Sequence, residues 1–486
     1  MMERDRISGE HEGQVLVLFA IASVVLIAFL ALAVDAGLAM SERRGAQNAA
    51  DAASLAVARA MIDRGRDSIE DEATIEAYLT ANGYDGAGFE WEYTDDPDGV
   101  LVQVNIEVPR IFLGAFYEGD WSVSADAVSS LDTVPADYGL IALDETGNAV
   151  WAEGNTHISV TDGGIMSNSD VSCSGSSTIT AGTAVHAAGA ILDTSQLSIA
   201  CEIEGENGGE SSGRAPIEDP LAGTPQPPEP VYPTGLPAGQ CTYEDQSWNS
   251  RAVCQPGRYT NWSWGSGYGL RLEPGTYLFD TNFTTNPWGT GTVDMTPGAS
   301  YTFYVRNSTF AINNTSWDME SNDVSMYFLN STFTFTGGTD VVVLGSGLYY
   351  FDNSHFNPAS GATGRGEDVA FFFRNGGSMV SSGHTTDMQF TAPDYELYPG
   401  MQPNLLVHAP NNPSFELHLS AYSQNTSLNG IVYLPQGHFR LTGNTGGDWA
   451  NGQLIVGRFS AAGSSTGYVN YEQLIDMGTP QVWLIQ

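Results

Sequence analysis

Three segments of similar sequence recur in the C-terminal half of the chain, and they decide its fold. They read Val305-Arg306-Asn307-Ser308-Thr309-Phe310, Phe328-Leu329-Asn330-Ser331-Thr332-Phe333 and Phe351-Asp352-Asn353-Ser354-His355-Phe356. Their asparagines are 23 residues apart, and a fourth asparagine, Asn375, follows Asn353 after 22 residues. A period in the low twenties, with β-forming residues before a recurring Asn and Phe, is typical of the stacked coils of a parallel β-helix. We expect Asn307, Asn330, Asn353 and Asn375 to form a hydrogen-bonded ladder along the stack, with each phenylalanine stacked inside.

Weaker copies of this pattern extend the repeat in both directions. Asp280-Thr281-Asn282-Phe283 precedes the first segment, and looser copies occupy residues 405–415, 431–439 and 454–459. We therefore predict that residues 241–486 form an all-β region, a right-handed parallel β-helix. The alternative is a β-sandwich in which the similarity of the segments is accidental, and their constant spacing makes it less attractive.

The region before these repeats also lacks helical periodicity. Residues 138–202 are rich in Gly, Ser, Thr and Asn and contain short β-forming runs such as HISV and STITAG. Residues 203–240 contain the run EGENGGESSG and eight prolines between Pro216 and Pro237, so we predict an extended, exposed stretch with no strand directly after Cys201. This stretch is either a linker between two domains or a long insertion in one.

The four cysteines, Cys173, Cys201, Cys241 and Cys254, indicate two disulfides in an oxidising compartment. None lies in a C-x-x-C motif and no histidine cluster accompanies them, so the sequence does not indicate a zinc site. We favour the pairs Cys173–Cys201 and Cys241–Cys254. Four cysteines allow three pairings, and a Cys201–Cys241 bridge would instead close the proline-rich stretch.

The chain is strongly acidic, and its charge is unevenly distributed. Its 486 residues carry a formal net charge of −40, from 57 acidic residues and 17 basic ones, all of which are arginine. Residues 1–66 hold 7 arginines and 8 acidic residues, so nearly all of the negative charge lies in the rest. A surface this negative repels nucleic acid and anionic lipid, so both are excluded as partners of the large C-terminal region.

Residues 15–34 contain no charged residue. At about 1.5 Å per residue, a helix of this length spans roughly 30 Å, the thickness of the hydrocarbon core of a bilayer. A buried core helix seldom lacks a polar face over this length, and a signal peptide usually has an apolar run of only ~7–15 residues. We therefore predict a retained transmembrane helix that contacts the lipid bilayer through residues 14–34, after a cytoplasmic tail at 1–12.

The helix is expected to continue to residue 61, so that residues 13–61 form one element. Its second half carries small residues at three- and four-residue steps, namely Ala46, Ala49, Ala50, Ala53, Val57 and Ala60. Such a stripe allows close packing, either against the protein's own sheet, which we favour, or against another subunit. Residues 62–134 are expected to form a small α+β module with a helix at 70–81 and strands at 89–93, 100–108 and 121–128.

The N-terminal residues resemble a known family. Their pattern is similar to the N-terminal region of TadG-like proteins of tight-adherence (Flp) pilus systems. The matching positions are Gly13, Phe19, Ala20, Val34, Asp35, Gly37, Arg43, Arg44, Ala46, Gln47, Asn48, Ala49, Ala50, Asp51, Ala52, Ala53, Leu55 and Ala56. The resemblance implies a pilin-like module and a role in pilus assembly or anchoring, with other pilus-system subunits as partners. It also makes Gly13 and Gln14 a candidate processing site, although Leu18 stands where related pseudopilins carry a glutamate.

No arrangement of residues in the sequence indicates catalysis. Some β-helix proteins cleave polysaccharides with clustered carboxylates, but Asp318, Glu320, Asp323 and His384 show no recognisable spacing. The segment Asp170-Val171-Ser172-Cys173-Ser174 matches the D-x-S-x-S metal motif of von Willebrand A-type domains without the apolar strand that precedes that motif.

Two further sets of residues have alternative interpretations. The first set forms either a sugar-stacking surface or packing within the coils, and consists of Trp262, Trp264, Tyr268, Trp288 and Trp317. The second set forms either glycosylation acceptors or ladder positions, and consists of Asn261, Asn282, Asn307, Asn314, Asn330 and Asn425.

The sequence thus predicts a single-pass membrane protein with its bulk outside the cytoplasm. It would have a pilin-like α+β module and a C-terminal β-helix, and it would act structurally in pilus assembly, anchoring or adhesion. We expect no enzymatic activity, cofactor or metal. The alternatives are a carbohydrate-binding surface adhesin unrelated to pili, with surface glycans as partners, and a β-helix glycan lyase or hydrolase.

Overall fold

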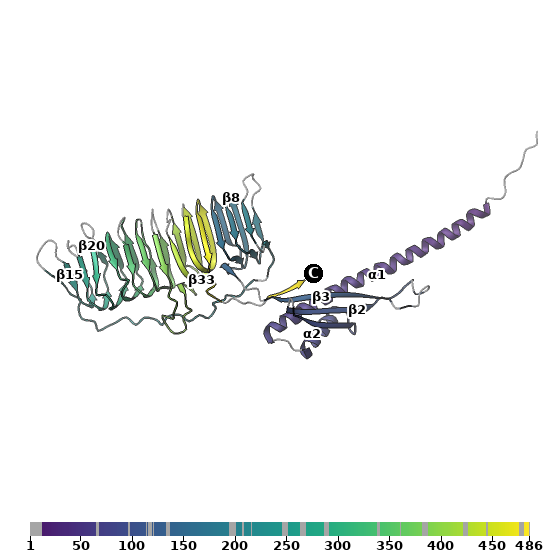
Figure 1. Ribbon diagram of the computed structural model, residues 1–486, viewed down its shortest axis with the longest axis horizontal. Coiled ribbons are helices and arrows are strands. Elements are labelled where there is room, and N and C mark those ends of the chain that lie inside the picture. Colours follow the sequence, from purple (N-terminus) through teal and green to yellow (C-terminus); the bar gives the residue numbers. More distant parts are fainter. Residues whose placement is uncertain are drawn as a thin grey trace, which may run out of the picture. The chain divides into compact units, whose positions relative to one another are not determined.

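The computed structural model describes residues 12–475 and 481–485, except for the gaps 65–67, 96–97, 113, 115–118, 120, 133–136, 194–200, 207–208, 215, 245–250, 263–268, 286–290, 338–340, 360, 382–386, 421–425 and 444–445. Predictions for the tail at 1–11 and for Trp264, Tyr268, Trp288, His384 and Asn425 lie outside the described residues. The chain divides into two compact units (Figure 1). The first is Met1–Pro135 with Gly478–Gln486, and the second is Ala136–Met477.

The first unit is a long helix and a short helix on a four-stranded antiparallel sheet. Its elements are α1 (Glu12–Arg64), α2 (Ser68–Ala81), β1 (Gly88–Asp95), β2 (Asp98–Glu107), β3 (Ser122–Asp132) and β36 (Gln481–Ile485), in the sheet order β1-β2-β3-β36. The predicted helices and the first three strands are confirmed.

The fourth strand of this sheet was not predicted. β36 pairs antiparallel with β3, and Asp132 lies opposite Gln481. The predicted β-helix boundary at residue 486 is therefore wrong, because the last strand of the second unit is β35 (Thr466–Tyr471). The second unit is an insertion between two neighbouring strands of the first unit's sheet.

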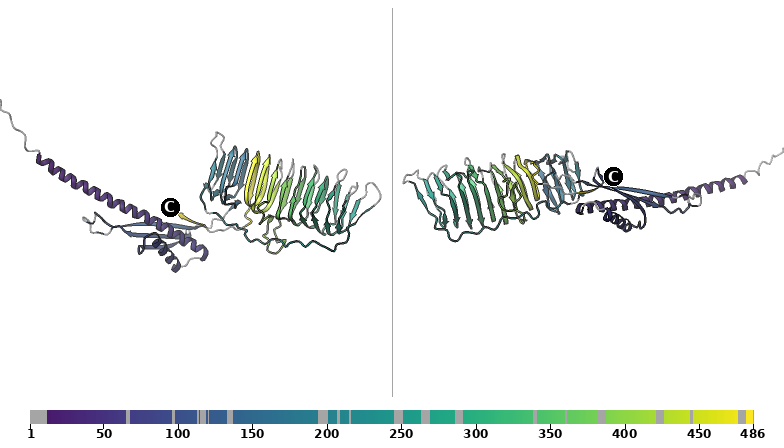
Figure 2. Two further views of the ribbon diagram at one scale, coloured as in Figure 1. Left: turned by 180° about the vertical axis from the view of Figure 1, so that it is seen from behind. Right: turned by 60° about the horizontal axis from the view of Figure 1, so that its bottom comes forward.

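The second unit is a parallel β-solenoid of about 12 turns, as the repeats predict. By the strand pairings, each complete coil contributes one strand to each of three faces. Figure 2 shows the coils stacked side by side. In stack order, the first face contains β15 (Arg251–Cys254), β17 (Gly269–Leu272), β20 (Gly291–Met295), β23 (Thr315–Asp318), β26 (Val341–Leu344), β28 (Thr363–Gly366), β30 (Asp387–Thr391), the starts of β33 (Ser427–Gly443) and β34 (Gly446–Gly463), β35, β6 (His157–Thr161), β9 (Thr178–Ala181) and β12 (Glu202–Gly205).

The second and third faces follow the same stack order. The second contains β16 (Gly257–Tyr259), β18 (Gly275–Phe279), β21 (Ser300–Arg306), β24 (Asp323–Leu329), the starts of β27 (Gly347–Phe356) and β29 (Val369–Ser381), β31 (Leu405–His408), the middles of β33 and β34, β4 (Tyr138–Ala142), β7 (Gly164–Ser167), β10 (Ala184–Ala187) and β13 (Gly209–Ser211). The third contains β19 (Phe283–Thr285), β22 (Thr309–Asn313), β25 (Thr332–Thr336), the ends of β27 and β29, β32 (Glu416–Ser420), the ends of β33 and β34, β5 (Asn148–Gly154), β8 (Asp170–Gly175) and β11 (Ile191–Asp193). β14 (Cys241–Tyr243) pairs antiparallel with β15 at one end of the stack.

The order of coils in the stack differs from their order in the sequence. β34 pairs in parallel with both β4 and β5, and β35 pairs with β6, so the last coil of the sequence stacks on the first. We call this junction the seam. Backbone hydrogen bonds continue across it, for example from Leu143 N to Val456 O at 2.8 Å and from His157 N to Ser465 O at 2.7 Å. The two ends of the inserted unit therefore meet inside the stack.

The proline-rich stretch joins the two ends of the stack. Residues 216–240, which we call the strap, run along the solenoid from β13 to β14 in both views (Figures 1 and 2). The strap is thus a long insertion within one unit, which was one of the two alternatives. Its predicted start at 203 is wrong because β12 and β13 are solenoid strands that pair with β9 and β10.

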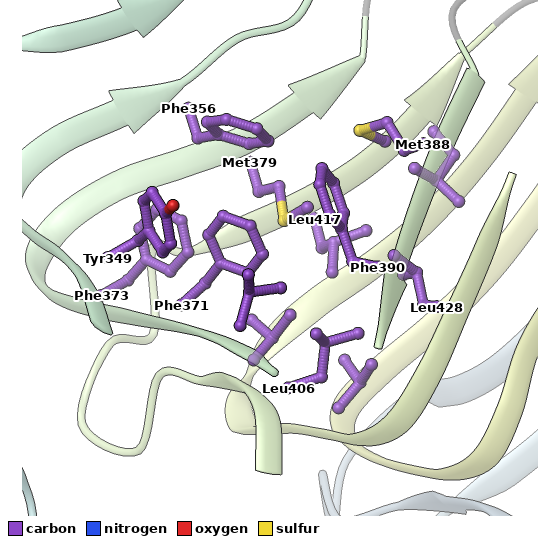
Figure 3. Packing of buried hydrophobic residues seen from close by; sticks show 14 of the residues in the cluster. Tyr349, Phe356, Phe371, Phe373, Met379, Met388, Phe390, Leu406, Leu417 and Leu428 are labelled. Carbon is purple, nitrogen blue, oxygen red and sulfur yellow. The ribbon is translucent and has the colours of Figure 1, made fainter. Parts of the chain in front are cut away.

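The solenoid has an inner core and an outer apolar layer. Inward residues stack from coil to coil, and Figure 3 shows Phe356, Phe371 and Phe390 converging with ring centroids 5.2 and 5.1 Å apart in succession. A separate cluster covers the outside of the second face, where Leu221 of the strap packs with Tyr433 and Ile431. Because this face is buried on both sides, its strands have continuous hydrophobic sequences rather than alternating hydrophobic and polar residues.

Candidate functional site

The N-terminal part of α1 exposes an uninterrupted apolar surface. Its large side chains are exposed from Leu16, at 75 %, to Val34, at 46 %. This segment has a mean hydropathy of 3.0 over 18 residues, none of it buried within the protein, which is long and apolar enough to cross a membrane. An exposed apolar surface of this size needs a nonaqueous partner, and its length fits a bilayer.

The C-terminal part of α1 packs against the protein's own sheet. Ala46, Ala49, Ala50, Ala53 and Val57 are fully buried, and Ala49, Ala50, Ala53 and Val57 share a core with strand residues. Those strand residues are Val100, Val102, Val104 and Ala127. The favoured interpretation of the small-residue stripe is confirmed: small side chains let the helix lie close to the sheet.

Polar residues of the same helix segment fix its register on β3. Gln47 donates from Nε2 to the Asp126 carbonyl at 2.8 Å and to Asp51 Oδ1 at 2.9 Å. Ser129 donates from Oγ to the Ser54 carbonyl at 2.9 Å, and both serines are buried. A shift of the helix along the sheet would break these long-range bonds, so the run Gln47–Ser54 sets the position of the sheet relative to the apolar segment.

Asp35 marks the boundary between these two parts of α1. Its side chain is fully buried, and its carboxylate accepts hydrogen bonds from the backbone N–H groups of Ile111 and Phe112 at 3.2 and 3.1 Å. Charge-assisted bonds to backbone donors compensate for the desolvation of a buried carboxylate. Asp35 therefore attaches the segment after β2 to the helix. The sequence placed Asp35 in a motif but did not reveal this role.

Gly13 and Gln14, the candidate processing site, lie in the first turn of α1. Cleavage after Gly13 therefore stays a prediction.

The predicted asparagine ladder is present for three coils. Asn330 Nδ2 donates to Asn307 Oδ1 at 3.2 Å, and Asn353 Nδ2 donates to Asn330 Oδ1 at 2.8 Å. All three have positive φ, between 46° and 52°, so each also forms the tight corner between the second and third faces. Asparagine is one of the few residues that adopt this conformation readily.

The ladder ends at Asn375, whose Nδ2 donates at 2.8 Å to Asp352 rather than to Asn353. The cause is a register shift between β27 and β29, since Asp352 lies opposite Arg374 but Ser354 lies opposite Gly377. One extra residue at this corner displaces the amide. The shorter spacing of 22 residues before Asn375 was the sequence signal for this change.

A second ladder, formed by buried serines, lies next to the first. The backbone N–H of Ser308 donates to Ser331 Oγ at 3.2 Å, and that of Ser331 donates to Ser354 Oγ at 2.9 Å. These serines were visible in the repeated N-S-[TH]-F segments but were not assigned a role. They satisfy corner N–H groups that the sheet hydrogen bonds do not reach.

A third ladder crosses the seam. Asn470 Nδ2 donates to Asn451 Oδ1 at 2.8 Å, and Thr161 Oγ1 donates to Asn470 Oδ1 at 2.8 Å. Since Thr161 belongs to an early coil and Asn470 to the last one, this ladder joins segments that are far apart in the sequence.

The structure joins Cys173 to Cys201 and Cys241 to Cys254, the two pairs favoured from the sequence. Cys173 and Cys201 are buried in the inner core near one end of the stack. Cys241 and Cys254 lie directly opposite each other in β14 and β15, at the other end. Each disulfide therefore closes an end of the solenoid.

Among the candidate catalytic residues that the structure describes, Asp318 and Asp323 each make a local hydrogen bond. Asp318 accepts a hydrogen bond from the Glu320 backbone N–H, and Asp323 accepts one from the Ser300 hydroxyl, so both have local structural roles. Asp170, of the D-x-S-x-S segment, accepts the Ala190 N–H at 2.7 Å within the solenoid. The part of the chain that the structure describes holds no group of three or more His, Cys, Asp or Glu side chains placed to bind a metal.

Two of the aromatic residues considered for a sugar surface, Trp262 and Trp317, pack within the coils. Trp317 is fully buried, and the Trp262 ring lies 4.5 Å from the Phe283 ring between centroids. A different aromatic row lies on the outside of the second face, where Tyr304, Tyr327 and Tyr350 stack in succession. Tyr232 of the strap lies 5.3 Å from Tyr304, so the strap covers one end of this row.

The strap also lines one side of an open pocket of about 710 Å³, whose other lining residues include Asn168 and Gln436. Asn168 binds both the N–H and the carbonyl of Ile217 at 2.8 Å, and Tyr433 donates to Asp219 at 2.7 Å. These bonds fasten the strap to coils on both sides of the seam.

Two histidines, one buried and one half-buried, lie next to the outer apolar layer. His408 is 3 % exposed between Phe372 and Tyr433, and burial lowers its pKa to about 3. His186 bonds to the Tyr138 hydroxyl at 2.6 Å, and burial, with a smaller effect of Arg214, lowers its pKa to about 4. Both histidines are therefore neutral at pH 7 and act as packing groups.

Comparison with known proteins finds a match in the N-terminal region. Residues 13–60 match a family model described as "Putative Flp pilus-assembly TadE/G-like". The match covers the apolar segment of α1, Asp35 and most of the packed segment, and it ends before α2. No curated protein and no solved structure matches the chain significantly.

Proposed function

Because residues 13–60 are TadE/G-like, we propose that this chain is a membrane-anchored structural protein of an Flp pilus-assembly system, with its bulk outside the cytoplasm. The observation that carries the proposal is the continuity of α1. One helix contains both the exposed apolar segment and the segment that is packed and hydrogen-bonded on the sheet. A subunit built in this way transmits its position in the membrane to a folded domain without a flexible joint.

The cysteines support an extracytoplasmic location for the solenoid. All four are paired, and disulfides persist in oxidising compartments. The acidic surface supports the same location because it keeps an exposed rod soluble.

The insertion of the solenoid between β3 and β36 supports a division of labour. In this proposal, the first unit docks with other pilus subunits. The solenoid is an inserted domain that is not needed for this docking. Because Asp132 and Gln481 are opposite each other in the antiparallel register, a short Asn-Gly turn can replace everything between them.

This arrangement allows a test by complementation. A strain that lacks the protein would be complemented with the full chain, with the first unit closed by an Asn-Gly turn, or with full-length Leu26→Arg/Ile27→Arg, which places charges in the apolar segment. We expect the full chain and the closed first unit to restore pili counted by electron microscopy, and the double variant to fail. An unchanged pilus count in the deletion strain would contradict the proposal.

Adhesion through the solenoid is a second candidate function. Trp151, on the third face near the seam, is half-buried, and its ring lies 5.2 Å from that of His438. It borders a hollow of about 430 Å³ together with Asn148 and Arg458. A partly exposed aromatic ring beside polar groups is suited to stacking on a sugar ring.

The test of adhesion is binding of the soluble protein, without residues 1–34, to a glycan array. Trp151→Ala should abolish binding, whereas Tyr468→Ala, at a tyrosine 37 % exposed, should not. If no glycan is retained, or if both variants bind equally, this candidate is excluded.

A further inference from the structure

Two large apolar side chains are exposed directly after β2, in the segment that leads to β3. Ile111 is 58 % exposed and Phe112 is 46 % exposed. In Figure 1, the ends of β2 and β3 next to this segment point along α1 toward its N-terminal part. Large contiguous exposed apolar surfaces commonly mark a contact with a partner or a membrane.

The position of these side chains is fixed by α1. The Asp35 carboxylate accepts from Ile111 N at 3.2 Å and from Phe112 N at 3.1 Å, with a further contact from Phe112 N at 3.3 Å. Arg110 donates from its guanidinium to the Gly119 carbonyl. The two apolar side chains are therefore held beside residue 35 of the helix.

Residue 35 is where the apolar surface of α1 ends. Asp35 is the first charged residue after residues 15–34, and Leu32 and Val34 just before it are 50 % and 46 % exposed. One helical residue adds about 1.5 Å, so Ile111 and Phe112 lie at the level at which the helix leaves the lipid. Exposed apolar side chains of the helix and of this segment therefore lie near the same residue, Asp35.

We propose that Ile111 and Phe112 insert into the interface of the bilayer beside α1, so that the first unit contacts the membrane at a second point. The partner is the boundary between lipid headgroups and acyl chains, where Phe and aliphatic side chains partition favourably. Asp35 acts as a positioning residue: its charge is taken up by backbone N–H groups, so it needs no water at this depth. With two points of contact, the sheet is held at a fixed angle to the membrane.

This inference rests on the proposed membrane anchoring, and one experiment separates the two. Full-length Phe112→Cys would be spin-labelled and reconstituted in phosphatidylcholine nanodiscs. All four native cysteines are paired, so the introduced thiol is the one that reacts. Two collision rates of the spin label would be measured, one with dissolved oxygen, which concentrates in lipid, and one with a water-soluble nickel chelate. Their quotient is the oxygen-to-nickel ratio.

Two matched labels calibrate the result. Leu26→Cys lies in the apolar segment at 61 % exposure, and Ile69→Cys lies on α2 at 81 % exposure. We expect the oxygen-to-nickel ratio at position 112 to resemble that at 26 and to exceed that at 69 by about tenfold. Adding Asp35→Ala should lower the ratio at 112 severalfold and leave the ratio at 26 unchanged.

Each other outcome has a defined meaning. If position 112 behaves like 69 while 26 is in lipid, the proposal is wrong and the anchor stands. If position 112 is shielded from both reagents, a protein partner or a second copy covers the segment, and the lipid proposal is wrong. If position 26 is itself accessible to nickel, the membrane anchoring fails and this inference fails with it.

Discussion

The two units of this protein are stabilised in contrasting ways. In the first unit, α1 is held on its sheet by contacts that occur once each, such as Gln47 with the Asp126 carbonyl and Asp35 with the segment after β2. In the solenoid, the same contact recurs from coil to coil, as in the stacked phenylalanines and the asparagine ladder. A unique contact fixes a position, whereas a repeated contact distributes stability along a stack.

The largest effect is expected from a cavity inside the solenoid. Phe333 is fully buried between Phe310 and Phe356, so Phe333→Ala should lower the free energy of unfolding of the surrounding coils by about 3–5 kcal/mol. Because each coil contacts mainly its neighbours, hydrogen exchange should rise in β22, β25 and β27 but not in β8. Thr332→Ala is the matched control. Exchange that rises equally in every coil would contradict the nearest-neighbour account.

A slightly smaller effect is expected from overpacking the helix–sheet contact of the first unit. Ala53 is fully buried, and Ala53→Leu should destabilise this unit by about 3 kcal/mol because the sheet leaves no space for the added carbons. Hydrogen exchange should rise across β1, β2 and β3 together, since the contact is not repeated elsewhere. Met40→Leu, at a side chain 69 % exposed on the same helix, should change stability by less than about 0.5 kcal/mol. Equal effects of the two changes would mean that the helix does not pack here.

The stability of the solenoid should depend on pH, because His408 is buried beside its outer apolar layer. His408 has a pKa of about 3 in the folded state, below the 6.5 of an unfolded chain, so the unfolded chain takes up the proton first. The free energy of unfolding should therefore fall as the pH drops from 6.5 to 3, and His408 should account for about 2 kcal/mol by pH 5. His408→Phe should remove this part of the loss in denaturation at pH 7 and pH 5. An identical pH dependence in the variant would show that His408 is not buried as described.

The smallest effect is expected at the asparagine corners. Asn330 has a φ of 48° and bonds to both neighbours in its ladder. Asn330→Gly keeps the backbone conformation and loses only the ladder bonds, which should cost about 0.5 kcal/mol. Asn330→Ala adds the left-handed strain of about 1 kcal/mol. If the two variants are equally stable in thermal unfolding, the asparagines are not selected for their backbone conformation.

Features with a local or periodic signal could be predicted from the sequence. The apolar run, the helix ending at Asn82-Gly83 and the alternating strand VLVQVNIEV each carry their signal within one element. The solenoid was predictable because Asn307, Asn330 and Asn353 repeat at a constant interval. The small-residue stripe on α1 was assigned correctly because alanines at this spacing fit a sheet at close range.

Features that depend on pairing between distant segments could not be predicted. β36 is a short apolar run whose partner, β3, lies more than 300 residues earlier, and nothing in either strand specifies the other. The seam has the same character, since β4 and β34 are both ordinary buried strands. β12 was not predicted because its sequence, EIEG, is polar. It forms a strand because its backbone pairs in parallel with β9.

We propose that α1 anchors the protein in a membrane with the solenoid outside the cytoplasm. Val231, in the strap, is 85 % exposed, so Val231→Cys places a reactive thiol on the surface of the second unit. The four native cysteines form disulfides and do not react. In spheroplasts that express this variant, a membrane-impermeant maleimide should label the protein fully, and the labelled protein should stay in the membrane fraction after carbonate extraction. Labelling only after the membrane is permeabilised, or release of the protein by carbonate, would contradict the account.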